Sequence, residues 1–182
     1  MANPDTPHGL SFAYTLHGGP PHMRKFTGDT AQGIYVGDIL YAAWNSSLIA
    51  TKTTGDAVDT EQYIGVAASY SASGAATDFW VYDDLANTVF TVQVDSSGIT
   101  FDSSFAMSRY GTTWGQGSTI TGQSRLELDV ASTGINLLRI IGLVDAPNNS
   151  TAGAHQEVYV QLVHTDIAGG GGNWIVGAAT TQ

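Results

Sequence analysis

Cysteine is absent from this 182-residue sequence, and long apolar runs are absent as well. Without cysteine, thiol catalysis, thiolate metal sites and disulfide bonds are excluded. No apolar stretch approaches the roughly 20 residues that a membrane-spanning helix needs. The first residues carry neither the basic start nor the apolar stretch of a secretory signal. We therefore expect a soluble protein that is made in the cytoplasm and stays there or is released by lysis.

Basic residues are also scarce. Six Lys and Arg residues stand against 16 Asp and Glu residues, so the formal net charge is −10. Nucleic acids and anionic membranes are polyanions, and a strongly acidic protein is repelled by both. We expect neutral or basic protein surfaces as partners, with no nucleic acid and no membrane among them.

Helical periodicity is hard to find in the sequence. Short segments that are rich in β-branched and aromatic residues, or that alternate apolar with polar residues, recur between clusters of Gly, Asn, Asp and Ser. This pattern predicts an all-β fold, an antiparallel β-barrel or sandwich of about ten short strands. Ser103–Gly111 is the best candidate for a helical turn. The expected strands are Ser11–Leu16, Met23–Gly28, Asp38–Ala43, Leu48–Thr53, Tyr63–Ser71, Asp78–Asp84, Thr88–Asp95, Ser124–Val130, Leu137–Asp145 and Glu157–His164.

The two ends of the chain differ in composition from its middle. Residues 1–10 contain two prolines and little apolar surface, which predicts an extended N-terminal arm that is ordered only against a neighbouring chain. Residues 11–166 are predicted to form a single β-rich domain, and residues 167–182 a glycine-rich hinge with an apolar tail. We expect both ends to contact another chain, because the tail is too apolar to remain in water. The predicted contact residues are Asn3, Pro4, Asp5, Thr6, Pro7, His8, Trp174, Ile175 and Val176.

A pair of neighbouring carboxylates is the first candidate for chemistry. Asp83 and Asp84 end one expected strand, and the short segment "LAN" leads into the next. Asp and Asn are typical of such turns because their side chains bond the nearby backbone. A metal site at this pair would need further carboxylates close by in sequence, and the pattern of a calcium loop is absent. We therefore interpret Asp83 and Asp84 as structural turn residues.

Histidines and tryptophans are further candidates. His17 and His22 flank a Gly-Gly-Pro-Pro loop, which could hold a metal ion or serve as an oxyanion loop. The usual context of a zinc site and the G-x-S-x-G motif of a hydrolase are both absent, so we expect a rigid exposed loop. Trp44, Trp80 and Trp114 could stack on sugars, but an aromatic residue in or near a strand is more often buried, and we expect these three to be buried.

Several segments carry a resemblance to a known family. They are "MANPDTPHGL" at the start, then "VYDDLANTVFTVQVD", "TITGQSRLELD" and "LLRIIGLVDAPNNSTAGAHQEVYVQLVHTD". In this order and spacing they resemble a set of small structural proteins of tailed bacteriophages, which are encoded near the major capsid protein and regarded as capsid decoration or cement proteins. The resemblance extends from Met1 to about Asp166. It departs at Leu85, where the family usually has Pro, and at Thr91, where it usually has an acidic residue; the last residues look like an addition.

The resemblance implies a structural virion protein with no catalytic residues to carry over. Such a protein would decorate the outer surface of the capsid and stabilise it by bridging neighbouring major capsid protein subunits. We expect no enzyme activity, no metal and no cofactor, and a homotrimer whose several contacts add avidity. Two alternatives remain open from the residues themselves. One is a carbohydrate- or receptor-binding β-sandwich, and the other is a hydrolase that uses Asp83, Asp84 or the histidine loop.

Overall fold

The computed structural model describes residues 3–28, 32–42, 49–52, 62–74, 77–100, 107–131 and 137–163. Within these ranges the fold is all-β and contains no helix, which confirms the predicted fold class. Each of the ten expected strands has a counterpart, and three further short strands were not predicted. The strands are β1 (Ser11–Thr15), β2 (Met23–Gly28), β3 (Ile39–Ala42), β4 (Ile49–Lys52), β5 (Gln62–Ala67), β6 (Asp78–Tyr82), β7 (Thr88–Gln93), β8 (Ile99–Thr100), β9 (Arg109–Thr113), β10 (Glu127–Asp129), β11 (Leu138–Leu143), β12 (Ala152–Gly153) and β13 (Glu157–Leu162).

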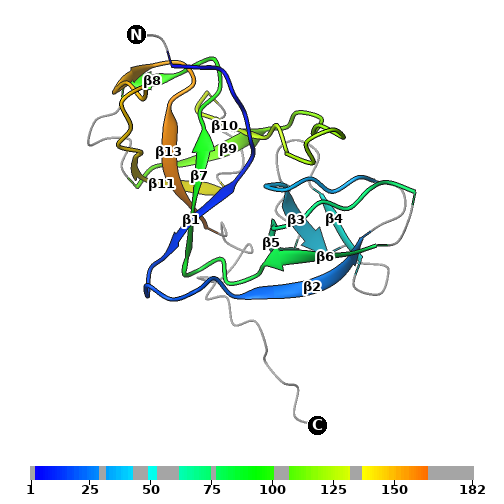
Figure 1. Ribbon diagram of the computed structural model, residues 1–182. Coiled ribbons are helices and arrows are strands. Elements are labelled where there is room, and N and C mark those ends of the chain that lie inside the picture. Colours follow the sequence, from blue (N-terminus) through cyan, green and yellow to red (C-terminus); the bar gives the residue numbers. More distant parts are fainter. Residues whose placement is uncertain are drawn as a thin grey trace, which may run out of the picture.

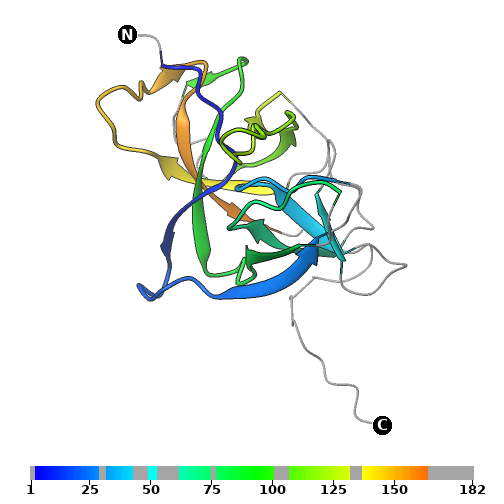
Figure 2. The ribbon, with the colours of Figure 1, turned by 45° about the vertical axis from the view of Figure 1, so that its right-hand side comes forward.

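The strands form an open sheet, a closed barrel and a small ribbon (Figure 1). The six-stranded sheet has the order β1-β7-β13-β11-β9-β10, and all its neighbouring strands are antiparallel. The barrel closes in the order β2-β4-β3-β5-β6, where β2 and β4 are parallel. The ribbon pairs β12 with β8. Figures 1 and 2 show the barrel beside the sheet, and β1 is followed directly by β2 of the barrel.

Alternation along β6 determines which of its side chains enter the barrel. Phe79 and Val81 are buried, whereas Asp78 and Trp80 on the other face are exposed. Successive side chains of a strand point to opposite faces, so this pattern is what a half-buried strand requires. The prediction that Trp80 is buried is therefore wrong, because Trp80 lies on the outer face of the barrel and is 47% exposed. Trp44 lies outside the described residues.

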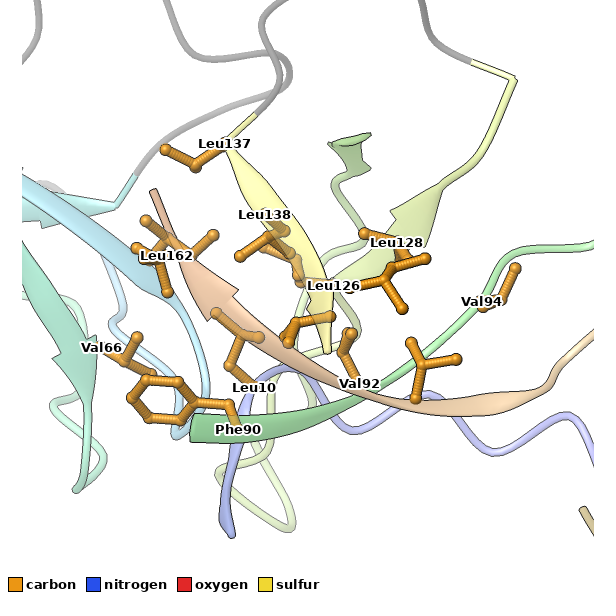
Figure 3. Close-up of a cluster of buried hydrophobic side chains, with 14 of the residues drawn as sticks. Leu10, Val66, Phe90, Val92, Val94, Leu126, Leu128, Leu137, Leu138 and Leu162 are labelled. Atoms are coloured by element: carbon orange, nitrogen blue, oxygen red, sulfur yellow. The ribbon is translucent and has the colours of Figure 1, made fainter. Parts of the chain in front are cut away.

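One large core joins the sheet to the barrel. Side chains from β7, β11 and β13 of the sheet, among them Phe90, cluster with Ile39 of β3 and Val66 of β5 (Figure 3). Leu10, at the end of the arm, is part of the same cluster. A second, smaller cluster fills the barrel and contains the buried ring of Phe79. Because one cluster takes side chains from both units, the sheet and the barrel stabilise each other by burying shared apolar surface.

The segment that was expected to be a helical turn is partly a strand. Arg109–Thr113 is β9, which pairs with β10 on one side and β11 on the other. Local sequence favoured a turn there, but the two flanking strands offer the backbone partners on both sides, and tertiary pairing overrides local propensity. The first residues of that predicted turn, 103–106, lie outside the described residues. Among the residues described, no helix is long and apolar enough to cross a membrane.

The end of the N-terminal arm passes through the junction between barrel and sheet. The backbone N of Leu10 donates to the carbonyl oxygen of Gly37 at 3.0 Å. Gly37 has a φ of +92°, and a Cβ atom there would lie 2.8 Å from the backbone N of Leu10. Such a separation is shorter than van der Waals contact allows, so only glycine permits the two backbones to approach this closely. The close contact between Leu10 and Gly37 therefore determines the position of the end of the arm.

Candidate functional site

The N-terminal arm, residues 3–10, lies along its own domain (Figures 1 and 2, dark blue). The side chain of Gln93 on β7 forms the central anchor: its Nε2 donates to the carbonyl oxygen of Pro4 at 2.8 Å, and its Oε1 accepts from the backbone N of Thr6 at 3.0 Å. Asn3 donates through Nδ2 to the carbonyl oxygen of Ala154 at 2.8 Å. Gln93 is almost fully buried, and the arm supplies the hydrogen bonds that a buried amide requires.

These contacts correct one expectation. The arm was expected to become ordered only against a neighbouring chain, but it binds its own β7 and the segment before β13. The reason is that a buried glutamine side chain carries one donor group and one acceptor, as a strand backbone does, and so it can hold an extended segment without a sheet edge. The outer sides of Pro4, Asp5 and Thr6 remain exposed. The contact of residues Asn3–His8 with another chain stays a prediction.

A serine, a histidine and a glutamate are linked by hydrogen bonds near the end of the arm. His8 Nε2 lies 2.8 Å from Glu157 Oε1, and His8 Nδ1 lies 3.0 Å from Ser11 Oγ. The hydrogen bond with His8 lowers the pKa of Glu157, because it favours the charged carboxylate. Three such groups in a chain are the arrangement of a nucleophile, a base and an orienting acid in acyl transfer.

The cleft beside His8 argues for anchoring rather than acyl transfer. It has a volume of about 80 Å³, whereas pockets for organic ligands span roughly 300–1,000 Å³. Ser11 is not among the residues that line it, so the hydroxyl does not face the space in which a substrate would sit. We interpret the chain Ser11–His8–Glu157 as a brace that ties the arm to β1 and β13. The lining residues are Pro4, Thr6, His8, Gln93, Asn148, Asn149, His155 and Glu157.

A second polar group, which we call the arm cluster, consists of Asp5, Glu127 and His155. One potential ligand atom of each residue lies within 4.8 Å of the others. His155 Nδ1 is 3.7 Å from Asp5 Oδ1 and 3.8 Å from Glu127 Oε1. The pKa of Glu127 is raised, first by burial and then by the negative charge of Asp5, with a smaller contribution from Asp95. Sequence reasoning missed this group, because its members are distant in sequence and form no spaced motif.

The two adjacent aspartates have different structural roles. Asp84 accepts from Nδ2 of Asn87 at 3.0 Å through each carboxylate oxygen, and its carbonyl oxygen accepts from Thr88 Oγ1 at 2.6 Å. Asp84 therefore closes the turn between β6 and β7. Asp83 makes no such bond; it contacts His22 Nδ1 at 2.5 Å and Arg24 Nε at 3.0 Å. Its carboxylate connects the end of β6 to the residues at the start of β2.

We expect Asp84→Ala to lower the free energy of unfolding by about 1 kcal/mol, because Asn87 and the turn lose their acceptor. Urea denaturation measures the change. Asp84→Asn keeps one carbonyl acceptor and serves as the matched control, with an expected loss of about half as much. If Asp84→Ala were as stable as the parent, the bonds to Asn87 would not hold the turn.

A loop between β9 and β10 presents a large apolar side chain to solvent. Ile120 is 95% exposed, although it is a β-branched residue that elsewhere fills the core. The loop is held by hydrogen bonds from Gly122 N to the carbonyl oxygen of Ser118 at 2.7 Å and from Thr121 N to Ser118 Oγ at 3.2 Å. Nothing in the local pattern distinguished Ile120 from a buried residue, so the sequence did not predict this feature.

The outer face of the barrel presents a second set of exposed apolar residues. Met23 of β2 is 44% exposed, and Trp80 of β6 lies directly opposite Lys25 on the neighbouring strand. Lys25 Nζ pairs with Asp78 Oδ2 at 2.7 Å, so charged groups border the indole of Trp80.

The predicted contact residues Trp174, Ile175 and Val176 lie outside the described residues. Comparisons with protein-family models, with curated proteins and with solved structures find no match to this chain.

Proposed function

We propose that this protein is a structural virion protein that binds the outside of a tailed-phage capsid and stabilises it by bridging neighbouring major capsid protein subunits. The observation that carries the proposal is the exposed side chain of Ile120 on a hydrogen-bonded loop. An isoleucine that is kept out of the core and held in one place is suited to enter a pocket on a partner. Its burial in an interface would contribute about 1.5–3 kcal/mol.

A bridging protein needs a second surface, and the outer face of the barrel offers one. Met23 and Trp80 lie there on paired strands, away from the β9–β10 loop in sequence and on other elements. Tryptophan and other aromatic residues are enriched at the centres of interfaces. With two surfaces, one molecule can contact two capsid subunits. A homotrimer would make several such contacts at once and would bind the capsid more tightly than one molecule does. The exposed side of the arm, from Pro4 to Thr6, is a third candidate contact.

The charge of the chain supports a place on the outer surface of the virion. A formal net charge of −10 repels the packaged nucleic acid and an anionic membrane alike. It favours a partner with neutral or basic patches. The resemblance to phage decoration proteins supports the same assignment, with synthesis in the host cytoplasm and no catalytic role.

One observation favours a second candidate function, carbohydrate binding. The indole of Trp80 is half exposed on the β2–β6 strand pair and is bordered by Lys25, Thr27 and Asp78, which can donate to or accept from sugar hydroxyls. Sugars stack on aromatic faces with polar groups at the rim. A glycan panel probed with the whole protein would separate the two functions: binding that is lost in Trp80→Ala would favour a receptor-binding role.

Ile120→Asp is the sharpest test of capsid binding. We expect affinity for expanded capsids that lack the protein to fall about 30-fold, which corresponds to the ~2 kcal/mol of an interface hot spot. Co-sedimentation of the labelled protein with these capsids measures it. Thr119→Asp is the matched control, because it adds the same charge to the same loop and leaves Ile120 in place; it should bind at near-parent affinity.

The stability of heads provides the second readout. Heads that lack the protein should release their DNA at a lower temperature than complete heads, and the added protein should restore them. If the protein does not bind expanded capsids, and heads without it are as stable as complete heads, the proposed function is wrong. Equal losses in Ile120→Asp and Thr119→Asp would show that charge, and not the apolar contact, accounts for the effect.

A further inference from the structure

The arm cluster joins three separate segments of the chain. Asp5 belongs to the N-terminal arm, Glu127 is the first residue of β10, and His155 lies in the short segment between β12 and β13. Their side chains converge although no two of them are neighbours in sequence. Each contributes an oxygen or nitrogen atom of the kind that binds a divalent metal ion.

Two of the converging atoms have no access to solvent and no hydrogen-bond partner among the described residues. They are Oε1 of Glu127 and Nδ1 of His155. Their distance of 3.8 Å is too long for a hydrogen bond. Buried polar atoms are normally satisfied, and leaving both unsatisfied costs free energy. A metal ion placed between these two atoms and the carboxylate of Asp5 would give each of them a partner.

The electrostatics of the cluster favour a cation in that place. Asp5 and Glu127 place two carboxylates at 3.7 and 3.8 Å from His155 Nδ1, and the charge of Asp95 is also nearby. Asp95 itself is occupied, because its two carboxylate oxygens accept from the backbone N and the hydroxyl of Ser97. A divalent ion would neutralise the charge that Asp5 and Glu127 bring together.

We propose that Asp5, Glu127 and His155 bind a divalent transition-metal ion such as Zn²⁺, which fastens the N-terminal arm to β10 and to the segment before β13. With metal–ligand bonds of about 2.0–2.1 Å and tetrahedral angles, ligand atoms are about 3.4 Å apart. The two distances from His155 Nδ1, 3.7 and 3.8 Å, exceed this by a few tenths of an ångström, and the oxygens of Asp5 and Glu127 lie within 4.8 Å of each other. The side chains must therefore shift inward to bring the three atoms to bonding distance. Water would complete the fourth position.

The geometry of the arm prepares Asp5 for this role. Its two neighbours in sequence, Pro4 and Thr6, are both held by the side chain of Gln93, so the backbone of Asp5 is fixed before any ion binds. The side chain of Asp5 is 64% exposed, which leaves the ion a path from solvent. One imidazole and two carboxylates are a ligand set that suits zinc and neighbouring transition metals better than calcium, because calcium prefers oxygen ligands alone.

The competing interpretation is an ion pair without metal, in which a protonated His155 lies between the two carboxylates. Direct titration distinguishes the two. The full chain, freed of metal by EDTA and dialysed, is titrated with Zn²⁺ at pH 7.5 in a calorimeter, and separately with Co²⁺, whose visible spectrum reports the coordination geometry. We expect one saturable site, a tetrahedral Co²⁺ spectrum and a higher melting temperature with Zn²⁺.

Three variants and a control complete the experiment. Asp5→Asn, Glu127→Gln and His155→Asn should each weaken Zn²⁺ binding by at least about tenfold, since each replaces a carboxylate or imidazole ligand by a neutral amide, which is a weaker ligand. His17→Asn, which changes an exposed histidine of the β1–β2 turn, should leave it unchanged. Because Asp5 is exposed, Asp5→Asn should fold as the parent does. It therefore tests the metal site even if Glu127→Gln or His155→Asn proves unstable. Hydrogen exchange at the backbone amides of Asp5, Thr6 and His8 should slow when Zn²⁺ is added to the parent and not when it is added to His155→Asn.

The proposal is overturned if Zn²⁺ does not bind the parent saturably, or if it binds Asp5→Asn and Glu127→Gln as tightly as the parent. It is also overturned if binding is lost in His17→Asn, which would place the ion elsewhere. None of these outcomes depends on capsid binding, so the metal site and the proposed function are tested separately.

Discussion

Phe90→Ala is expected to lower the free energy of unfolding by about 3–5 kcal/mol, which is the usual cost of deleting a fully buried aromatic side chain. Phe90 lies on β7, which pairs with β1 and β13 in the six-stranded sheet, and it has no exposed surface. Its ring meets that of Tyr82 edge to face, with centroids 5.8 Å apart, and Tyr82 stacks on Phe12 at 5.5 Å. Figure 3 shows Phe90 beside Val66 of the barrel and Leu10 of the arm.

The size of this effect follows from the position of Phe90 where sheet, barrel and arm meet. The cavity would be lined by side chains from all three, and none of them can move inward without losing its contacts elsewhere. Urea denaturation, followed by fluorescence and by circular dichroism, measures the change. Phe90→Leu preserves most of the volume and should cost less than half as much. A loss below about 1.5 kcal/mol for Phe90→Ala would show that the two units do not depend on this contact.

Gly98→Ala is expected to destabilise the fold by about 2–4 kcal/mol, from overpacking combined with backbone strain. A Cβ atom at Gly98 would lie 2.3 Å from the carbonyl oxygen of Gly153, and Gly98 has a φ of +61°. The obstacle is backbone, held by the pairing of Ile99 with Gly153 in the β8–β12 ribbon, so it cannot rotate away.

Gly142→Ala is the matched control for this substitution. Gly142 lies in β11, and a Cβ atom there would meet nothing within 4 Å. We expect its stability to change by less than about 0.5 kcal/mol in the same urea experiment. If the two variants were equally stable, the close approach of Gly98 to Gly153 would not exist in solution. Because Ala154 and His155 follow Gly153, Gly98→Ala should also displace His155 and weaken the Zn²⁺ binding that we propose for the arm cluster.

The sequence by itself determined the fold class and the approximate position of ten strands. Alternation is a local property: in β6 it identifies Phe79 and Val81 as one face and Trp80 as the other, whatever the strand packs against. The turn at Asp84 is also local, since its partners Asn87 and Thr88 follow within four residues. Features whose partners are close in the chain can be predicted from spacing and residue type.

Only the tertiary structure decided which of the two faces is covered. The pattern of β6 could not show that the Trp80 face lies outside the barrel, because that depends on the closure of the barrel through the parallel pairing of β2 with β4. For the same reason the exposure of Ile120 was not predicted. Burial is a property of what packs against a residue, and in a β-fold most of those partners are distant in sequence.

The candidate sites depend on the tertiary structure most of all. Gln93 was expected only as a strand residue, yet its side chain holds the arm, and Asp5, Glu127 and His155 meet only because the arm crosses the sheet beside β10 and the segment before β13. No spacing rule connects residues brought together in this way. The sequence supplied the ionisable groups and the net charge of −10, and the fold decided which of these groups face one another, because loop closure and core packing set distances that composition does not contain.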